Sequence, residues 1–169
     1  MGHNEKGILA NLPRGERILV DSNILTYHLL DYPTFGPICE KFFQDILDEK
    51  YQGFITPLIA SETLFNFIKA YILKTYGVKG KDVAILLKRD LKILQEISFD
   101  RPKEIFGIFN ILDIGAAEVE KSFEYMSKYA LLTNDALNAA TMKVNKINSI
   151  ATNDKDFDRL AGVKVWGLL

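Results

Sequence analysis

Four carboxylates stand at points where the sequence pattern turns from strand to helix or begins a helix. These four acids are Asp21, Glu62, Asp135 and Asp154. One acid at the start of a helix is commonly a capping residue, but capping does not explain four acids at four such points. Oxygen ligands without soft partners favour Mg²⁺ or Mn²⁺ over zinc. The pattern therefore predicts one acidic metal site assembled from the whole length of the chain.

Asp21 closes the first apolar run of the sequence. Residues 18–20 are typical of a buried parallel strand, and a helical pattern follows them. In open α/β sheets, ligands bind at the carboxyl ends of the strands, which is where this acid stands. Taken alone, the segment favours a simple helix cap formed by Asp21, Ser22 or Asn23.

Glu62 lies at the margin of the apolar stripe of a helix predicted over residues 58–76. An ionised carboxylate against a core face is costly unless it is paired or binds a metal. Lys69, two helical turns further on, could supply the pairing charge. From this segment alone, a metal ligand and a structural ion pair are equally good interpretations.

Asp135 and Asp154 each have capping as an alternative role. Asp135 begins an alanine-rich helical pattern, and the helix dipole stabilises an acid in the first turn. Asp154 follows a strand-like segment, residues 148–152, and precedes a short helical segment. Asp156, two residues later, fits a helix-start acid at least as well as a member of the site.

Taken in order, these motifs resemble those of the PIN-domain nucleases, most closely the VapC-type toxins of toxin–antitoxin systems. The resemblance runs from about Arg17 to Leu169. The matching motifs are Asp21-Ser22-Asn23, Glu62, Asp135 with Ala136-Leu137-Asn138-Ala139-Ala140, and Thr152-Asn153-Asp154-Lys155-Asp156-Phe157. Each motif is weak alone, and the ordered set is what makes the resemblance specific.

The resemblance implies a metal-dependent endoribonuclease that hydrolyses phosphodiester bonds in RNA. It assigns Asp21, Glu62, Asp135 and Asp154 to one or two Mg²⁺ or Mn²⁺ ions, and it implies a cognate antitoxin and a homodimer. Residues expected to orient the carboxylates or water are Asn23, Thr152 and Asp156. The alternatives are a stand-alone PIN nuclease of RNA processing or decay, and a degenerate PIN module that only binds. Intact acids at all four positions weigh against degeneracy.

Alternating strand and helix patterns predict an α/β fold with a parallel sheet. Strands are expected near residues 18–21, 53–56, 108–112, 148–152 and 163–167. Helices are expected near residues 24–31, 36–50, 58–76, 81–96, 115–129, 135–146 and 155–160. The PIN resemblance implies three layers, α/β/α, around a central five-stranded parallel sheet with strand order 3-2-1-4-5.

The length and composition suit one hydrophobic core. The chain has 169 residues, of which 48% are hydrophobic, so we expect a single domain over residues 17–169. Residues 1–16 form an N-terminal extension that is expected to be flexible. A formal net charge of −1 argues against a protein that holds long nucleic acid mainly by a basic field. No apolar signal region or membrane span is found, which predicts a cytosolic protein.

Several other chemistries lack the residues that they need. Only two histidines occur, His3 and His28, which argues against a metal-free ribonuclease that uses a histidine acid–base pair. The single cysteine, Cys39, is expected to be a buried core thiol, and no zinc cluster is present. A haloacid-dehalogenase-like phosphatase needs a second Asp at position 23, which is Asn. No Walker loop or dinucleotide-binding motif is found.

Two further groups of residues suggest contacts with partners. Candidate phosphate contacts, or simply solvated cations, are Lys143, Lys146, Lys155 and Arg159. The third predicted helix carries more aromatic residues than one stripe needs, which indicates a partner surface, although core packing is expected for Phe65. These aromatic residues are Phe65, Phe67, Tyr71 and Tyr76.

Overall fold

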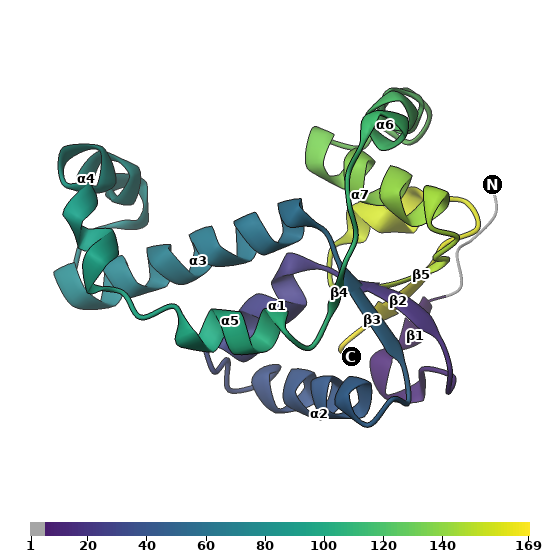
Figure 1. The fold of residues 1–169 in the computed structure, drawn as a ribbon, viewed down its shortest axis with the longest axis horizontal. Coiled ribbons are helices and arrows are strands. Elements are labelled where there is room, and N and C mark those ends of the chain that lie inside the picture. Colours follow the sequence, from purple (N-terminus) through teal and green to yellow (C-terminus); the bar gives the residue numbers. More distant parts are fainter. Residues whose placement is uncertain (1–5) are drawn as a thin grey trace.

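The computed structural model describes residues 6–169, which form a parallel sheet between two layers of helices (Figure 1). The strands are β1 (Lys6–Ile8), β2 (Arg17–Val20), β3 (Gln52–Ile55), β4 (Asn110–Ile111), β5 (Ser149–Ala151) and β6 (Lys164–Gly167). They lie in the order β1-β6-β5-β2-β3-β4, and all five neighbouring pairs are parallel. The predicted three-layer α/β/α fold is confirmed.

The predicted strand order 3-2-1-4-5 is also found, as β4-β3-β2-β5-β6, but the predicted count of five strands was too low. The sixth strand, β1, pairs with β6 at the edge of the sheet, with Lys6 opposite Val165. It belongs to the extension that we expected to be flexible, of which residues 1–5 lie outside the described residues. A three-residue strand with one large apolar side chain shows too little alternation for a sequence pattern to reveal it.

Seven α-helices are found in residues 6–169. They are α1 (Ser22–Leu29), α2 (Gly36–Leu47), α3 (Pro57–Tyr76), α4 (Val83–Arg89), α5 (Asp100–Phe106), α6 (Ala116–Tyr129) and α7 (Thr133–Val144). In Figure 1, α1, α2 and α5 lie on one side of the sheet, and α6 and α7 lie on the other. Short 3₁₀ helices occupy Leu9–Asn11, Gly80–Asp82, Leu91–Glu96 and Lys155–Arg159.

Two stretches differ from the predicted helices. The single helix expected over 81–96 is divided, because Asp90 adopts an extended conformation and its carboxylate accepts a hydrogen bond from the Lys92 amide. Helix α5 was not predicted. Pro102 lies in the first turn of α5, where its missing N–H would have had no partner within the helix.

The core of the molecule centres on β2, which lies between β3 and β5. Ile18, Leu19 and Val20 are completely buried, as expected for a strand covered on both faces. The predicted burial of Cys39 is confirmed. Since β2 ends at Val20, the next residue, Asp21, lies at the middle of the carboxyl edge of the sheet.

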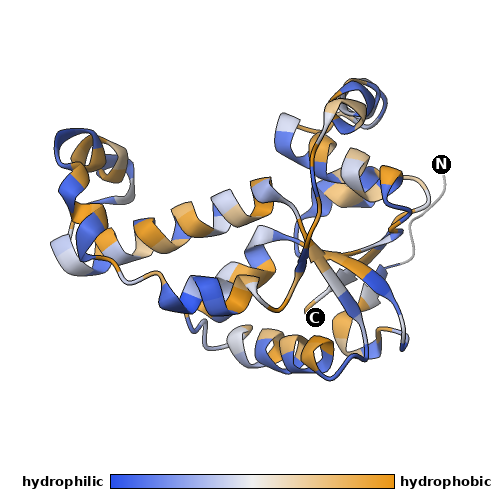
Figure 2. Cartoon of the chain, viewed as in Figure 1, coloured by the Kyte–Doolittle hydropathy of each residue, from blue (hydrophilic) through white to orange (hydrophobic). Residues whose placement is uncertain are grey.

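Helix α3 extends well beyond the sheet and carries α4 at its far end (Figure 1). Hydrophobic residues recur along this extended part (Figure 2), where Ile72, Val83 and Ile93 form a small separate core. The helix ends at Tyr76, as predicted, and Gly77 caps it in the left-handed conformation. No helix among residues 6–169 is long and apolar enough to cross a membrane. The predicted cytosolic location stays a prediction.

Candidate functional site

A pocket of about 260 Å³ brings together the four acids singled out in the sequence. Its lining residues are Asp21, Ser22, Asn23, Thr26, Tyr27, Tyr32, Glu62, Asn66, Asp135 and Asp154. The pocket lies beyond the carboxyl ends of β2 and β5, from which the chain continues in opposite directions along the sheet, to β3 beside β2 and to β6 beside β5. Such a switch point is where open α/β sheets bind their ligands.

Asp21 is the most buried of the four acids, with 6% of its surface exposed. Its Oδ1 accepts a hydrogen bond from the Ser22 amide at 2.8 Å, so it also caps α1. Its Oδ2 accepts from Asn23 Nδ2 and from Thr152 Oγ1, both at 2.6 Å. Asp21 therefore both caps a helix and presents a carboxylate whose orientation is held by three hydrogen bonds.

Burial raises the pKa of Asp21 to about 6, against the hydrogen bonds from Thr152 and Ser22, which lower it. The negative charges of Glu62 and Asp154 raise it further. Carboxylates gathered in one pocket repel each other, and a proton or a bound cation relieves this repulsion. The raised pKa of Asp21 therefore reflects both its burial and the crowding of carboxylates in this pocket.

Thr152 and Asn23 connect the ends of the two central strands. Thr152 Oγ1 accepts hydrogen bonds from the Asp154 amide at 2.9 Å and from Asn23 Nδ2 at 3.0 Å, and it donates to Asp21. Asn23 Oδ1 accepts from the Asn153 amide at 3.3 Å. The geometry is that of residues that orient a carboxylate, and their functional role stays a prediction.

Asp135, Asp154 and Asp156 form the tightest acidic group among residues 6–169. One carboxylate oxygen of each lies within 4.8 Å of those of the other two. Asp135 lies in the first turn of α7, which begins at Thr133, two residues earlier than predicted. Its pKa is raised to about 6, first by burial and then by the charges of Asp154 and Asp21.

Asp156 is close to this group but is already engaged. Its carboxylate forms an ion pair with Arg159 at 2.6 Å, and its amide donates to Asp154 Oδ1 at 2.8 Å. Asp156 does not line the pocket, whereas Asp154 does. Arg159, one of the candidate phosphate contacts, therefore holds an acid in this structure. The other three candidates, Lys143, Lys146 and Lys155, are exposed.

Glu62 lies on α3 and faces the pocket rather than the core. Its side chain is exposed, so the prediction that it lies against a core face was wrong. The buried side of this turn is formed by Ile59 and Thr63 instead. Among the described residues, no ion pair links Glu62 to Lys69. The structural-pair interpretation therefore finds no support in this part of the chain.

Four lining residues were not singled out from the sequence. Asn66 lies one helical turn after Glu62, and this spacing could have identified it as a neighbour on the same face. It donates a long hydrogen bond, 3.4 Å, to Thr26 Oγ1. Tyr27 and Tyr32 come from α1 and the loop after it, and no motif marks them.

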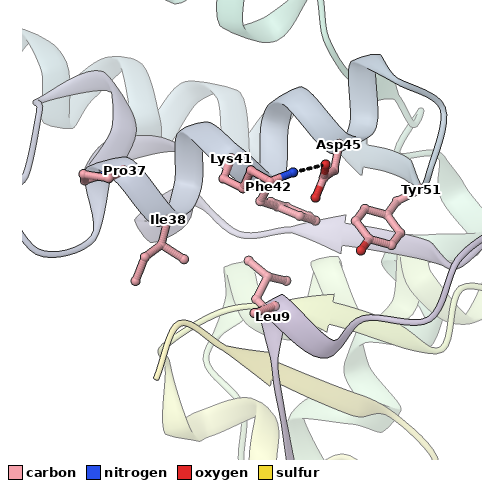
Figure 3. A pocket seen from close by; sticks show the side chains of 8 residues that line it. Leu9, Pro37, Ile38, Lys41, Phe42, Asp45 and Tyr51 are labelled. Atoms are coloured by element: carbon pink, nitrogen blue, oxygen red, sulfur yellow. Dashed lines mark hydrogen bonds and ion pairs between the residues drawn. The ribbon is translucent and has the colours of Figure 1, made fainter.

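An apolar pocket of about 330 Å³ lies between Leu9 and α2 (Figure 3). Its only acidic lining residue is Asp45, which forms ion pairs with Lys41 and Lys50 at 2.5 Å each. Hydrogen bonds from these two lysines lower the pKa of Asp45. The Asp45 carboxylate is already paired with two lysines, so it offers neither a metal ligand nor a general base. The acidic pocket is therefore the better candidate site.

The aromatic residues of α3 are divided between core and surface. Phe67 and Tyr71 pack partly against the two cores. Phe65 is 49% exposed, so the prediction that it packs in the core was wrong, and Tyr76 is also exposed.

Comparisons with known proteins agree with this geometry. A model of the PIN domain family matches residues 18–163. Ribonuclease VapC2 of Methanocaldococcus jannaschii is 38% identical over 145 residues, which cover 85% of this chain and 89% of that protein. Ribonuclease VapC6 of the same organism is 30% identical over 127 residues, covering 74% and 82%.

Solved structures share the fold at low sequence identity. A chain of VapBC2 from Rickettsia felis, solved bound to a DNA fragment from its promoter, aligns with a TM-score of 0.58 and 14% identity. That alignment covers 89% of this chain and 98% of the other. PAE2754 from Pyrobaculum aerophilum aligns with a TM-score of 0.54 and 16% identity, covering 91% and 92%.

Proposed function

Because the chain belongs to the PIN domain family, we propose that it is a VapC-type endoribonuclease that uses Mg²⁺ or Mn²⁺ to hydrolyse RNA phosphodiester bonds. The observation that carries this proposal is the pocket at the switch point, where Asp21, Glu62, Asp135 and Asp154 converge. The names of the relatives, both ribonucleases, support the reaction class.

The residues present fit a hard divalent cation. The lining of the pocket contains carboxylate, amide and hydroxyl oxygens and neither cysteine nor histidine. Oxygen ligands at 2.0–2.6 Å from one cation lie within about 5 Å of each other. Oxygens of Asp135 and Asp154 lie within 4.8 Å of each other and meet that condition, and Asp21 and Glu62 line the same pocket. We assign Asp21, Glu62, Asp135 and Asp154 as the ligands.

A bound ion of this kind supplies a water of lowered pKa and positive charge near the leaving oxygen. The protein contributes the geometry around it. Thr152 and Asn23 hold the Asp21 carboxylate in one orientation, so that no side chain has to reorganise when the substrate binds. The Asn66 amide, which makes only a long hydrogen bond to Thr26, is available to a substrate oxygen.

We extend the proposal to two protein partners, a cognate antitoxin and a second copy of the chain. An apolar pocket of about 600 Å³ on α3 and β4 supports a protein-binding surface there. Its lining residues are Pro57, Ala60, Ser61, Leu64, Phe65, Ile68 and Ile111. Phe65 and Ile111 are large apolar side chains that are exposed on this surface. Exposed apolar patches of this kind mark sites of protein–protein interaction.

The reaction can be tested with labelled structured and unstructured RNA, incubated with Mn²⁺, with Mg²⁺ or with a chelator. The proposal expects internal cleavage that requires the ion. A stand-alone PIN nuclease of RNA processing would behave alike but would bind no antitoxin. A degenerate binding module would retain RNA without cutting it.

The two acids of the last turn should differ in importance. We expect Asp154→Asn to lower the turnover of RNA more than Asp156→Asn, because Asp154 lines the pocket while Asp156 is paired with Arg159. Side-by-side kinetics at saturating Mn²⁺ measure the difference, and the two variants serve as matched controls for charge. A lower turnover in the Asp156 variant than in the Asp154 variant would mean that Asp156 is the fourth ligand. The other three ligand assignments would then be unaffected.

The stability of the metal-free protein should depend on pH in an unusual direction. The folded-state pKa of Asp21, about 6, lies above its ordinary value of 3.8, so the folded state binds the proton more tightly than the unfolded state. Unfolding free energy should therefore rise by about 1 kcal/mol as pH falls from about 7 to about 5, and by about 3 kcal/mol in total once the pH is below 3.8. Thermal melting in chelator measures this rise, which should shrink in Asp21→Asn. A wild-type Tm that falls across this window would contradict the raised pKa.

A further inference from the structure

Tyr32 lies at the mouth of the acidic pocket and has no role in holding an ion. It belongs to the loop between α1 and α2 and lines the pocket together with the four acids. Its side chain is 47% exposed, in contrast to the buried Asp21 beneath. A large aromatic residue open to water beside a polar pocket is a candidate for contact with a ligand.

Contacts with other aromatic residues hold the exposed ring of Tyr32 in place. Tyr32 contacts the ring of Tyr27 edge-on, with ring centroids 5.2 Å apart. Tyr27 in turn contacts Phe35 at 4.8 Å, and both of these pack against the main core. The backbone of Tyr32 is also held, by a hydrogen bond from its amide to the Tyr27 carbonyl at 2.9 Å. The ring is therefore positioned before any ligand arrives.

Arg101, on helix α5, stabilises the turn that carries Tyr32. Asp31 adopts a left-handed backbone with φ 52°, which is uncommon for residues other than glycine. Arg101 of α5 donates two hydrogen bonds to the Asp31 carboxylate, at 2.7 and 2.5 Å, and a third to the His28 carbonyl. These contacts with α5 fix the turn that carries Tyr32.

The negative charge of the pocket favours an uncharged contact between the protein and RNA. The pocket is acidic, and the chain has a net charge of −1, so a broad basic field does not hold RNA here. An aromatic face attracts a nucleobase without any opposing charge, and the contact tolerates any base because every base has a π-face. An unpaired base can reach such a face, whereas a base inside a duplex is already stacked on both sides.

We propose that Tyr32 is a stacking platform for an unpaired nucleobase next to the scissile phosphate. This inference rests on the proposed nuclease function. It adds an RNA-binding residue that acts through its ring and not through its hydroxyl group.

The test is steady-state cleavage of an unstructured RNA oligonucleotide with Mn²⁺. Tyr32→Ala should raise KM by about 5- to 100-fold with kcat largely retained, and Tyr32→Phe should behave like the wild type. Tyr32→Leu retains an apolar contact with Tyr27 but lacks an aromatic face, and it replaces the Ala variant if that one melts early. Tyr76→Ala is the matched control, because Tyr76 is an exposed tyrosine far along α3 that bonds to Glu96.

A second substrate separates stacking from a structural effect. An oligonucleotide with an abasic site beside the cleaved bond should lower kcat/KM of the wild type, and the loss should not add to that of Tyr32→Ala. An unchanged KM in Tyr32→Ala and Tyr32→Leu, with an active wild type, would overturn this inference alone. Absence of cleavage by the wild type would instead overturn the proposed function.

Discussion

The Asp21→Asn variant should lose RNA cleavage by on the order of a hundredfold or more while keeping its fold. Asp21 presents the most buried carboxylate of the pocket and is held by hydrogen bonds from Ser22, Asn23 and Thr152. The amide has nearly the same shape but lacks the negative charge that attracts a divalent cation. Cleavage of labelled RNA at saturating Mn²⁺, with circular dichroism of the same samples, measures activity and fold together.

The matched control for this variant is Asp113→Asn. Asp113 is exposed and does not line the acidic pocket, so the same change of charge there should leave cleavage unaltered. Full activity in the purified Asp21 variant would contradict the assignment of Asp21 as a ligand. A loss of helical signal would show that the hydrogen bonds around Asp21 are needed for folding, and Thr152→Ser would then test the same site more mildly.

Mn²⁺ should raise the Tm of the wild-type protein, and it should raise that of a Glu62→Gln, Asp135→Asn double variant much less. A ligand that binds only the folded state stabilises it by mass action, by about 2.7 kcal/mol at a hundred times its Kd. For a chain of this size that corresponds to a rise of roughly 5–10 °C. Removing two of the four pocket acids weakens the binding, so most of this rise should be lost.

Differential scanning calorimetry with and without Mn²⁺ measures both shifts. A Glu104→Gln, Asp113→Asn double variant removes the same charge from exposed positions outside the pocket and should respond like the wild type. Equal shifts in all three proteins would mean that Glu62 and Asp135 are structural. No shift in any of them, together with RNA binding, would favour the degenerate binding module.

Local sequence patterns determined the elements that carry the site. The apolar run at 18–20 predicted a buried strand, and the structure places β2 at the centre of the sheet with Asp21 at its carboxyl end. Such a pattern is readable because a strand covered on both faces has to be apolar at successive positions. The order of the other predicted strands came from the resemblance to the PIN family, since spacing along the chain does not define spatial neighbours.

The tertiary structure alone decided which side chains are exposed and which residues meet. Helical periodicity marked an apolar stripe on α3 but not where the helix leaves the sheet, so Glu62 and Phe65 were both expected against the core. The edge strand β1 also lay beyond any local pattern.

Tyr32 shows the same limit at the site itself. Its place beside the four acids depends on a left-handed turn at Asp31 that Arg101 holds from 70 positions away in the sequence. A local pattern reports the preference of each segment for a conformation and for burial. Contacts between distant segments depend on how the packed elements are oriented, and that information appears only when the chain has folded.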